Sequence, residues 1–132
     1  MRAVSLASMQ NGEWISTDQL IDSVNKMSLG LLQLGIQPGD KIAVVTTANR
    51  IEWNICDLGI SQIGAINVPL YPTISEADYQ YILNHAEAKL CIVSDEQLFN
   101  KVNAIKGNVA MMRDLYTFEH VPGAKNYAEI MK

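Results

Sequence analysis

The stretch Asp40-Lys41-Ile42-Ala43-Val44-Val45-Thr46-Thr47 places four consecutive apolar residues between a turn and a polar segment. The same pattern returns in Leu90-Cys91-Ile92-Val93, which is followed by Ser94-Asp95. Short apolar runs without alternation are typical of strands that are buried on both faces, as in parallel sheets. Each run leads through a short polar turn into a segment with helical features. The two stretches therefore predict an α/β fold.

Sequence features typical of helices occur before and after these strands. Ser16 with Gln19 predicts a capping box, and apolar residues then recur at steps of four and three (Leu20, Val24, Met27, Leu31 and Leu34). Gly35 is expected to end this helix, and Pro38-Gly39 to make a turn. Three further helices are predicted to begin at Asn49 with Glu52, at Ser75 with Asp78, and at Ser94 with Gln97.

The remaining strands are shorter. Ala3–Met9, the turn Asn11-Gly12 and Glu13–Ile15 predict a β-hairpin at the start. Other strands are expected at Ala65–Val68 (stopped by Pro69), Val109–Met112 and Leu115–Phe118, with a last helical turn or two at Asn126–Met131. Strand and helix alternate four times after the hairpin. We therefore expect a single α/β subdomain over residues 1–132, with a mostly parallel sheet and helices on both faces.

Composition narrows the class of protein. The chain has 132 residues, 48% of them hydrophobic and 18% charged, which is typical of a globular domain and not of a disordered one. A net charge of −4 disfavours nucleic acid as the main partner. The longest nearly apolar stretch, Leu29–Ile36, is too short for a membrane helix, and the first residues lack a secretory signal. Cys56 and Cys91 are expected to be buried free thiols, with a disulfide as the alternative. These features favour a cytoplasmic location of the protein.

The residues alone predict neither a complete catalytic site nor a metal site. Gly30, Gly35 and Gly39 do not have the spacing of a phosphate-binding loop, and no G-x-S-x-G elbow occurs. The two histidines, His85 and His120, lie 35 positions apart without neighbours at metal-ligand spacing. His85 comes late in a predicted helix, where a cation complements the helix dipole, so a structural role is expected.

Several short sequence motifs nevertheless occur in an order that can be compared with known families. They are Trp14-Ile15-Ser16-Thr17-Asp18-Gln19-Leu20, Leu34–Ala43 with its Leu-Gly and Gly-Asp pairs, Asn49-Arg50-Ile51-Glu52-Trp53, Gln62–Thr73 with Val68-Pro69-Leu70-Tyr71, and Tyr81–Glu87. In this order they resemble the N-terminal part of the adenylate-forming enzymes, most closely the long-chain fatty acyl-CoA synthetases. Thr17 stands where an aromatic residue is usual, and Ile51 replaces a proline.

The resemblance implies a two-step reaction. A fatty acid attacks the α-phosphate of ATP with Mg²⁺ to give an acyl-adenylate and pyrophosphate, and the thiol of CoA then displaces AMP. The family's phosphate loop and C-terminal lid domain do not occur in these 132 residues. We therefore expect an N-terminal portion of a larger ligase, inactive alone, with no catalytic residue and no tight binding of ATP, Mg²⁺ or CoA. Its main partner would be the remainder of its own polypeptide, in an enzyme that is compatible with peripheral membrane association.

The resemblance also gives candidate residues for the path of CoA. These are Tyr71 and Thr73 in the turn after a predicted strand, with Lys101 near the nucleotide end. The alternative is structural: Tyr71 and Pro72 would fix a turn, and Lys101 would be a solvated helix residue. An unpaired sheet edge and uncovered apolar faces also predict self-association.

Two other functions remain open on the sequence. The first is a non-catalytic α/β module that binds a partner. The second keeps the chemistry and changes the substrate, as in an aryl-CoA ligase or an amino-acid adenylation domain.

Overall fold

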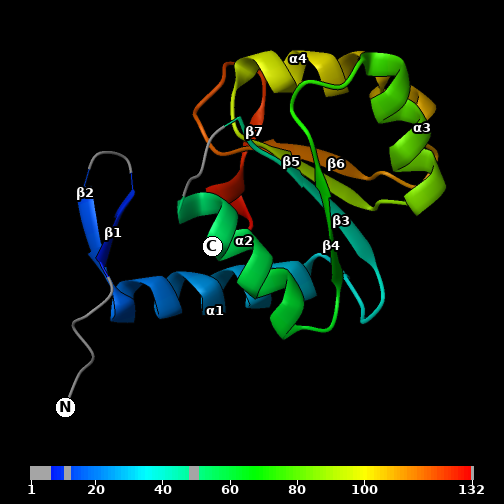
Figure 1. The fold of residues 1–132 in the computed structure, drawn as a ribbon. Helices are drawn as coiled ribbons and strands as arrows, with labels where there is room; N and C mark the ends of the chain where they lie inside the picture. Colours follow the sequence, from blue (N-terminus) through cyan, green and yellow to red (C-terminus); the bar gives the residue numbers. More distant parts are fainter. Residues whose placement is uncertain (1–6, 11–12, 48–50, 132) are drawn as a thin grey trace.

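The protein has a central parallel sheet, described here from a computed structural model that covers residues 7–10, 13–47 and 51–131. The five strands are β3 (Lys41–Val45), β4 (Ile66–Leu70), β5 (Leu90–Val93), β6 (Asp114–Thr117) and β7 (Lys125–Asn126). Their order in the sheet is β4-β3-β5-β6-β7, and all neighbours are parallel. The expected parallel sheet is therefore confirmed (Figure 1).

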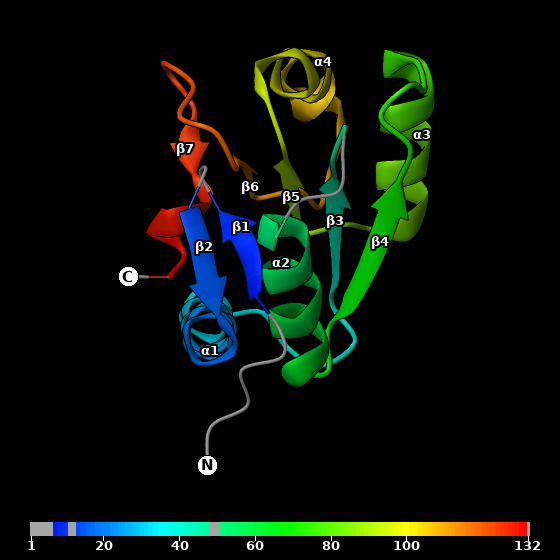
Figure 2. The ribbon, with the colours of Figure 1, turned by 60° about the vertical axis from the view of Figure 1, so that its left-hand side comes forward.

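Helices cover both faces of the sheet, as Figure 1 and Figure 2 show. One face is covered by α1 (Thr17–Gln33), α2 (Ile51–Gln62) and the 3-10 turn η2 (Tyr127–Glu129). The other face is covered by α3 (Glu76–Ala86) and α4 (Glu96–Ile105). The 3-10 turn η1 (Lys106–Asn108) follows α4. Two separate hydrophobic cores result. One holds Met27, Leu31, Ile42 and Ile92, and the other holds Ala43, Val45 and Tyr79. Successive residues of the central strands thus enter opposite cores, which explains why their sequences do not alternate.

The hairpin precedes the sheet and forms no part of it. Strand β1 (Ala7–Gln10) pairs with β2 (Glu13–Ser16) in an antiparallel ladder, as predicted. The predicted turn Asn11-Gly12 and the predicted helix start at Asn49 lie outside the described residues.

Helix α1 begins where the sequence indicates. The Ser16 side chain accepts a hydrogen bond from the Gln19 backbone (3.2 Å), and the Gln19 side chain accepts one from the Ser16 backbone (2.8 Å). This reciprocal pair is the predicted capping box. The prediction that Leu34 continues the apolar stripe of this helix is wrong. The helix ends at Gln33, and Leu34 is its C-cap and is 39% exposed.

Strand β4 runs through Pro69 instead of stopping before it. The Ile66 backbone N–H bonds to Asp40 of the neighbouring chain segment (2.8 Å). In a parallel pair every second residue faces the same neighbour, so Ile66, Val68 and Leu70 bond toward β3, and Pro69 faces away. Because β4 is an edge strand, the N–H that proline lacks would have pointed at solvent.

The predicted strand Val109–Met112 is a turn. The Val109 N–H bonds to the Lys106 carbonyl (3.1 Å), and the Met112 N–H bonds to the Val109 carbonyl (3.3 Å). Val109 and Met112 are nevertheless buried in the core beneath α3 and α4. Their apolar character therefore reflects a loop that closes the core. The short strand β7 was not predicted.

Both cysteines are free and buried, as expected. Cys56 belongs to the core under α2, and Cys91 belongs to the core on the opposite face of the sheet. The sheet separates the two thiols, which excludes the disulfide that the sequence left open. Burial raises the pKa of the Cys91 thiol to about 12, so the neutral thiol behaves as a small apolar side chain.

Candidate functional site

The chain topology points to the carboxyl ends of β3 and β5. Strand β4 follows β3 in sequence and pairs on one side of it, whereas β5 pairs on the other side. The connections through α2 and α4 consequently leave these two strands toward opposite faces of the sheet. In open α/β sheets, ligands bind in the crevice that forms where the strand order reverses in this way.

A compact polar cluster fills this position. The Thr47 backbone N–H donates to the Ser94 hydroxyl (3.1 Å), and the Thr47 hydroxyl donates to the Asp95 carboxylate (3.0 Å). Ser94 is itself buried and donates to the same carboxylate oxygen of Asp95 (3.2 Å). These bonds join the segment after β3 to the start of α4. The cluster holds the two strand ends in register with each other.

The structure corrects the predicted start of α4 by one residue. Asp95, and not Ser94, is the N-cap, and its carboxylate accepts a hydrogen bond from the Leu98 backbone (3.0 Å). Asp and Ser are both good N-caps, so the sequence alone does not separate them. The choice depends on Ser94, whose side chain points inward to Thr47.

The turn after β4 holds two of the three residues that were proposed to line the path of CoA. Tyr71 is 79% exposed, and Thr73 is also exposed. The backbone of this turn is fixed from two helices. The Tyr79 hydroxyl of α3 donates to the Tyr71 carbonyl (2.7 Å), and the Lys101 ammonium of α4 donates to the Ile74 carbonyl (3.1 Å).

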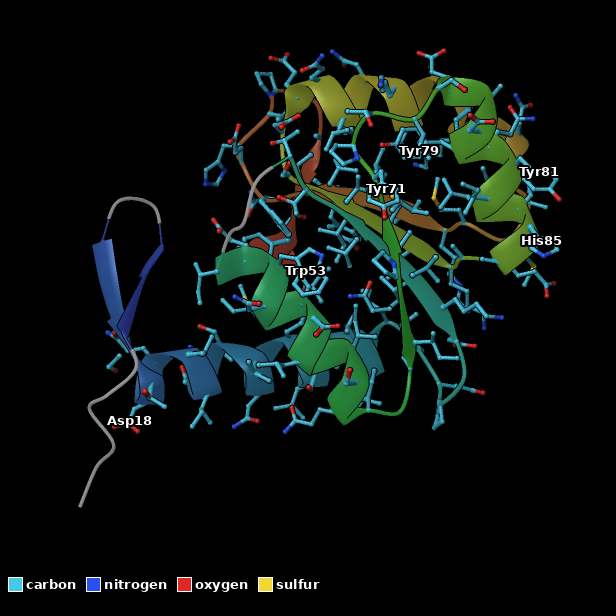
Figure 3. The ribbon with its side chains drawn as sticks, viewed as in Figure 1. Asp18, Trp53, Tyr71, Tyr79, Tyr81 and His85 are labelled. Carbon is cyan, nitrogen blue, oxygen red and sulfur yellow. The ribbon has the colours of Figure 1, made fainter. Side chains whose placement is uncertain are left out.

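Lys101 and Tyr79 also lie against each other. The Lys101 ammonium is 5.9 Å from the centre of the Tyr79 ring, within the range of a cation–π contact. The structure thus brings Lys101 to the turn that contains Tyr71 and Thr73, where it bonds directly to the Ile74 carbonyl and lies beside Tyr79. Figure 3 shows Tyr71 and Tyr79, which the hydrogen bond from the Tyr79 hydroxyl joins. Lys101 is half-buried, and one of its three N–H donors holds the backbone. This hydrogen bond gives Lys101 a structural contact with the turn.

Tyr79 is the residue that sequence analysis missed. Tyr79 lies on the apolar face of α3, and its ring is fully buried. The available signal was its hydroxyl, because a tyrosine at a core position needs a hydrogen-bond partner. Nothing local in the sequence indicates that this partner is a carbonyl eight positions earlier.

Comparison with known proteins places this geometry in a family. A family model described as AMP-binding enzyme matches residues 2–129. The chain belongs to the AMP-binding enzyme family. The resemblance inferred from the sequence motifs is thereby confirmed, and the parallel sheet belongs to an AMP-binding fold.

Individual AMP-binding relatives are considerably longer. The long-chain-fatty-acid–CoA ligase FadD15 of Mycobacterium bovis is 30% identical over 107 residues, which cover 80% of this chain and 18% of the relative. The crystal structure of the anthranilate CoA ligase AuaEII in complex with anthranoyl-AMP has a TM-score of 0.81 at 22% identity, covering 92% of this chain and 22% of that one. The uncharacterized protein Rv1549 of Mycobacterium tuberculosis is 26% identical over 102 residues, which fill 57% of it. The chain thus spans about a fifth of the length of the ligases that it matches.

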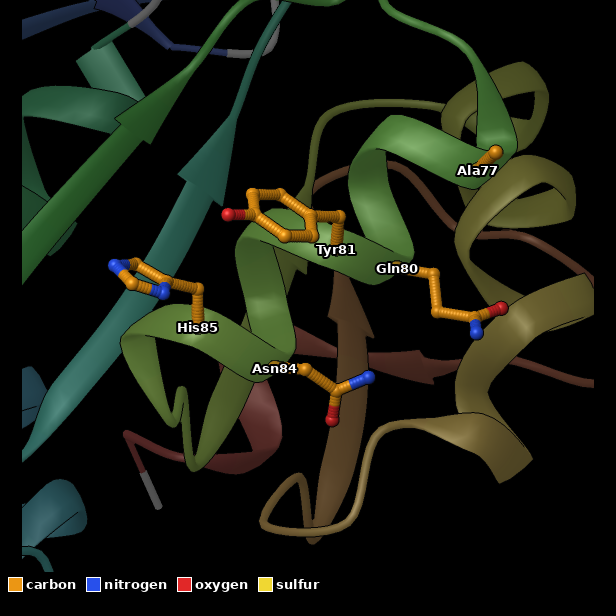
Figure 4. Close-up of a pocket in the computed structure, with 5 residues that line it drawn as sticks. All are labelled: Ala77, Gln80, Tyr81, Asn84 and His85. Carbon is orange, nitrogen blue, oxygen red and sulfur yellow. The ribbon is translucent and has the colours of Figure 1, made fainter.

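Other surface features of this AMP-binding chain have structural explanations. An open hollow of about 410 Å³ on α3 is lined by Ala77, Gln80, Tyr81, Asn84 and His85 (Figure 4). The Asn84 amide donates to the Asn108 carbonyl (2.9 Å), and the Asn108 amide donates to the Gln80 side chain (3.3 Å), so this side of α3 is tied to η1. On the other side the His85 ring stacks on the Tyr81 ring with 5.8 Å between centres.

Within the described ranges 7–10, 13–47 and 51–131, two kinds of feature are absent. No group of three or more His, Cys, Asp and Glu side chains there could hold a metal ion. No helix among these residues is long and apolar enough to cross a membrane.

Proposed function

We propose that this chain is the N-terminal portion of an ATP-dependent acyl-CoA ligase that activates a long-chain fatty acid as its acyl-adenylate and transfers it to CoA. The observation that carries the proposal is the AMP-binding match over residues 2–129, together with 30% identity to a long-chain-fatty-acid–CoA ligase over 107 residues. The protein that contains the chain would use ATP, Mg²⁺ and CoA.

The isolated chain is proposed to be inactive. The enzymes of this chemistry stabilise the charge that develops on the phosphates with positioned cations and backbone donors. In the described residues the candidate site offers instead a closed set of hydrogen bonds among Thr47, Ser94 and Asp95. A cluster that is already satisfied internally has little capacity to bind a triphosphate.

The coding sequence downstream of the Lys132 codon tests the proposal most directly. We expect the reading frame to continue into a loop similar to Thr-Ser-Gly-Thr-Thr-Gly, and the purified 132-residue chain to show no fatty-acid-dependent exchange of pyrophosphate into ATP. The longer product of that frame is the positive control for exchange. A stop codon directly after Lys132, or exchange by the chain alone, would contradict the proposal.

A second proposal assigns the turn 71–74 to the path of CoA. It is supported by the position of the turn at the carboxyl end of β4 and by its fixed backbone. Thr73→Val in the ligase that contains this chain is expected to raise the KM for CoA by about tenfold, with the KM for ATP unchanged, because one hydrogen bond to a substrate is worth about 1.5 kcal/mol. Ser61→Ala, which removes an exposed hydroxyl on α2, is the control. If Thr73→Val leaves the kinetics with CoA unaltered, the turn has only a structural role.

A non-catalytic binding module is the second candidate function. It is supported by the relative Rv1549, in which the matched region fills 57% of the length and less than half remains for other parts. The stop codon described above is the outcome that would favour it. Aryl and amino-acid substrates are alternatives within the ligase proposal, and a panel of carboxylic acids assayed with the longer protein would distinguish them from fatty acids.

A further inference from the structure

The turn between β4 and α3 is held through the carbonyl groups at its two ends. The Tyr79 hydroxyl donates to the Tyr71 carbonyl (2.7 Å), and the Lys101 ammonium donates to the Ile74 carbonyl (3.1 Å). The side chains of Tyr71 and Thr73, in contrast, are exposed. The two bonds to the backbone therefore constrain where the exposed side chains of the turn lie.

Tyr79 connects these two bonds with each other. Its hydroxyl bonds to the first residue of the turn, and the centre of its ring is 5.9 Å from the ammonium of Lys101, which bonds to the last residue. A cation at this distance from an aromatic ring is attracted to it. The ring is fully buried in a close-packed core and has little freedom to move. It thus restricts the ammonium of Lys101 as well as the carbonyl of Tyr71.

Lys101 uses its charge for the turn and not for an ion pair. In the part of the chain that the structure describes, Lys101 forms no ion pair with a carboxylate. A lysine of this kind can serve as a ligand for an anion or as a holder of backbone. Moving the half-buried ammonium to an anion outside the turn would break the bond to the Ile74 carbonyl and the contact with the Tyr79 ring. The geometry therefore favours the second role.

We propose that Lys101 and Tyr79 are positioning residues for CoA, and that Lys101 acts through the turn 71–74 without touching CoA itself. This inference rests on the proposed role of the turn in the path of CoA. It differs from the role that the family resemblance implies for Lys101, which is a direct contact near the nucleotide end. In this proposal, the two side chains hold the Thr73 hydroxyl at one position before CoA arrives.

The expected effect is on the binding of CoA and not on the first half of the reaction. A turn that becomes ordered only when its ligand binds lowers the affinity, because the lost conformational freedom is then part of the binding free energy. The acyl-adenylate forms before CoA is used. Loss of either bond should therefore raise the KM for CoA and leave the fatty-acid-dependent exchange of pyrophosphate into ATP unchanged.

Nuclear magnetic resonance of the 132-residue chain tests the positions in the absence of CoA. The backbone order parameters of Thr73 and Ile74 should be about 0.85 in the original chain, as in rigid backbone, and about 0.6 in Lys101→Met and in Tyr79→Phe. Each substitution removes one hydrogen bond and keeps the apolar part of the side chain, and far-UV circular dichroism checks that the fold is retained. Unchanged order parameters in both variants would overturn the proposal.

Lys26→Met is the matched control for this measurement. It also replaces an ammonium by an apolar group, but Lys26 is an exposed residue of α1, on the opposite face of the sheet, where it pairs with Asp22. The order parameters of the turn should therefore not change. An equal loss of order in Lys26→Met would mean that the effect is not specific to Lys101, and this too would overturn the proposal.

Kinetics of the ligase that contains this chain separate positioning from direct contact. Lys101→Met and Tyr79→Phe should each raise the KM for CoA about fivefold, with kcat and the KM for ATP unchanged. Because Tyr79 is fully buried, an effect that it shares with Lys101 comes through the turn. Lys101→Arg keeps a cationic donor and should stay within about twofold of the original KM. If Lys101→Met raises the KM for CoA and Tyr79→Phe does not, Lys101 binds CoA directly, and the proposal is overturned.

These measurements distinguish a failure of this inference from a failure of the proposed function. If the unaltered longer protein shows no turnover that depends on CoA, both are overturned. If Thr73→Val leaves the kinetics with CoA unaltered, the assignment of the turn is wrong and the positioning roles are overturned with it. If Thr73→Val raises the KM for CoA whereas Lys101→Met and Tyr79→Phe do not, only the positioning roles are overturned.

Discussion

Gly30→Ala is expected to destabilise the fold by about 3 kcal/mol, although alanine is normally the better helix former. A Cβ atom at this position would lie 1.5 Å from the Ile130 carbonyl oxygen and 2.5 Å from its carbon. Both are backbone atoms, so they can move away only if the whole turn around η2 moves. That turn buries Ile130 and Tyr127, and it places the Tyr127 ring edge-on to Phe118 with 5.3 Å between centres. The substitution therefore displaces one side of the core.

Urea unfolding of the 132-residue chain measures this effect. Gly107→Ala is the matched control, because no atom lies within 4 Å of a Cβ at that position and its backbone φ is not positive. We expect the control to change the free energy of unfolding by less than about 0.5 kcal/mol. Gly59→Ala should fall between the two, since its Cβ would lie 2.7 Å from Met27 Cγ, in a flexible side chain that can adjust. Equal stabilities for Gly30→Ala and Gly107→Ala would contradict the close approach of α1 and η2.

Sequence analysis missed this contact for a physical reason. Gly30 was considered only as a member of a phosphate-binding loop and was rejected as one. Its structural requirement comes from a residue 100 positions later in the chain. Local patterns in a single sequence carry no information about such a pair.

The features that could be predicted are those whose cause is local. The apolar runs at Ile42 and Leu90 indicate strands between two cores because each residue is buried on one side or the other. The caps at Ser16 and Ser75 follow from hydrogen bonds that span three residues. The end of β4 before Pro69 and the N-cap of α4 at Ser94 were mispredicted. Both features depend on the neighbouring strand β3 and the segment that follows it.

The candidate site likewise combines features that the sequence indicates with features that depend on distant parts of the chain. Tyr71, Thr73 and Lys101 came from a family resemblance, and the fold does bring Lys101 to the turn. What holds the turn in place is Tyr79, whose bond to the Tyr71 carbonyl joins α3 to the end of β4. Only the three-dimensional arrangement identifies the Tyr71 carbonyl as the partner of Tyr79.

Tyr79→Ala is expected to lower the free energy of unfolding, measured in urea, by about 4 kcal/mol, and Tyr79→Phe is expected to lower it by about 1 kcal/mol. The first variant removes a fully buried ring from the core with Leu83 and Val45. The second keeps the ring and removes only the 2.7 Å bond to the Tyr71 carbonyl. Amide hydrogen exchange in the turn 71–74 should therefore accelerate in Tyr79→Phe, while exchange in β5 remains slow. Unchanged exchange in the turn would show that the hydroxyl does not hold it.

Alkaline pH gives an independent measure of the same hydroxyl. Burial, followed by the nearby Cys91 and Asp95, raises the pKa of Tyr79 from 10.0 to about 12. The folded state thus favours the neutral phenol, which is also the form that donates to the Tyr71 carbonyl. Its contribution to stability is fully present below pH 10 and is lost as the pH rises toward 12, by about 2 kcal/mol at pH 12.

Comparison with Tyr79→Phe isolates this contribution, because both proteins keep the two buried thiols. The difference in the free energy of unfolding between the original chain and Tyr79→Phe should be constant up to pH 10 and then fall with increasing pH. A difference that stays constant to pH 12 would mean that the Tyr79 hydroxyl is exposed to solvent. In that case the bond from α3 to the turn would no longer account for the position of Tyr71 and Thr73.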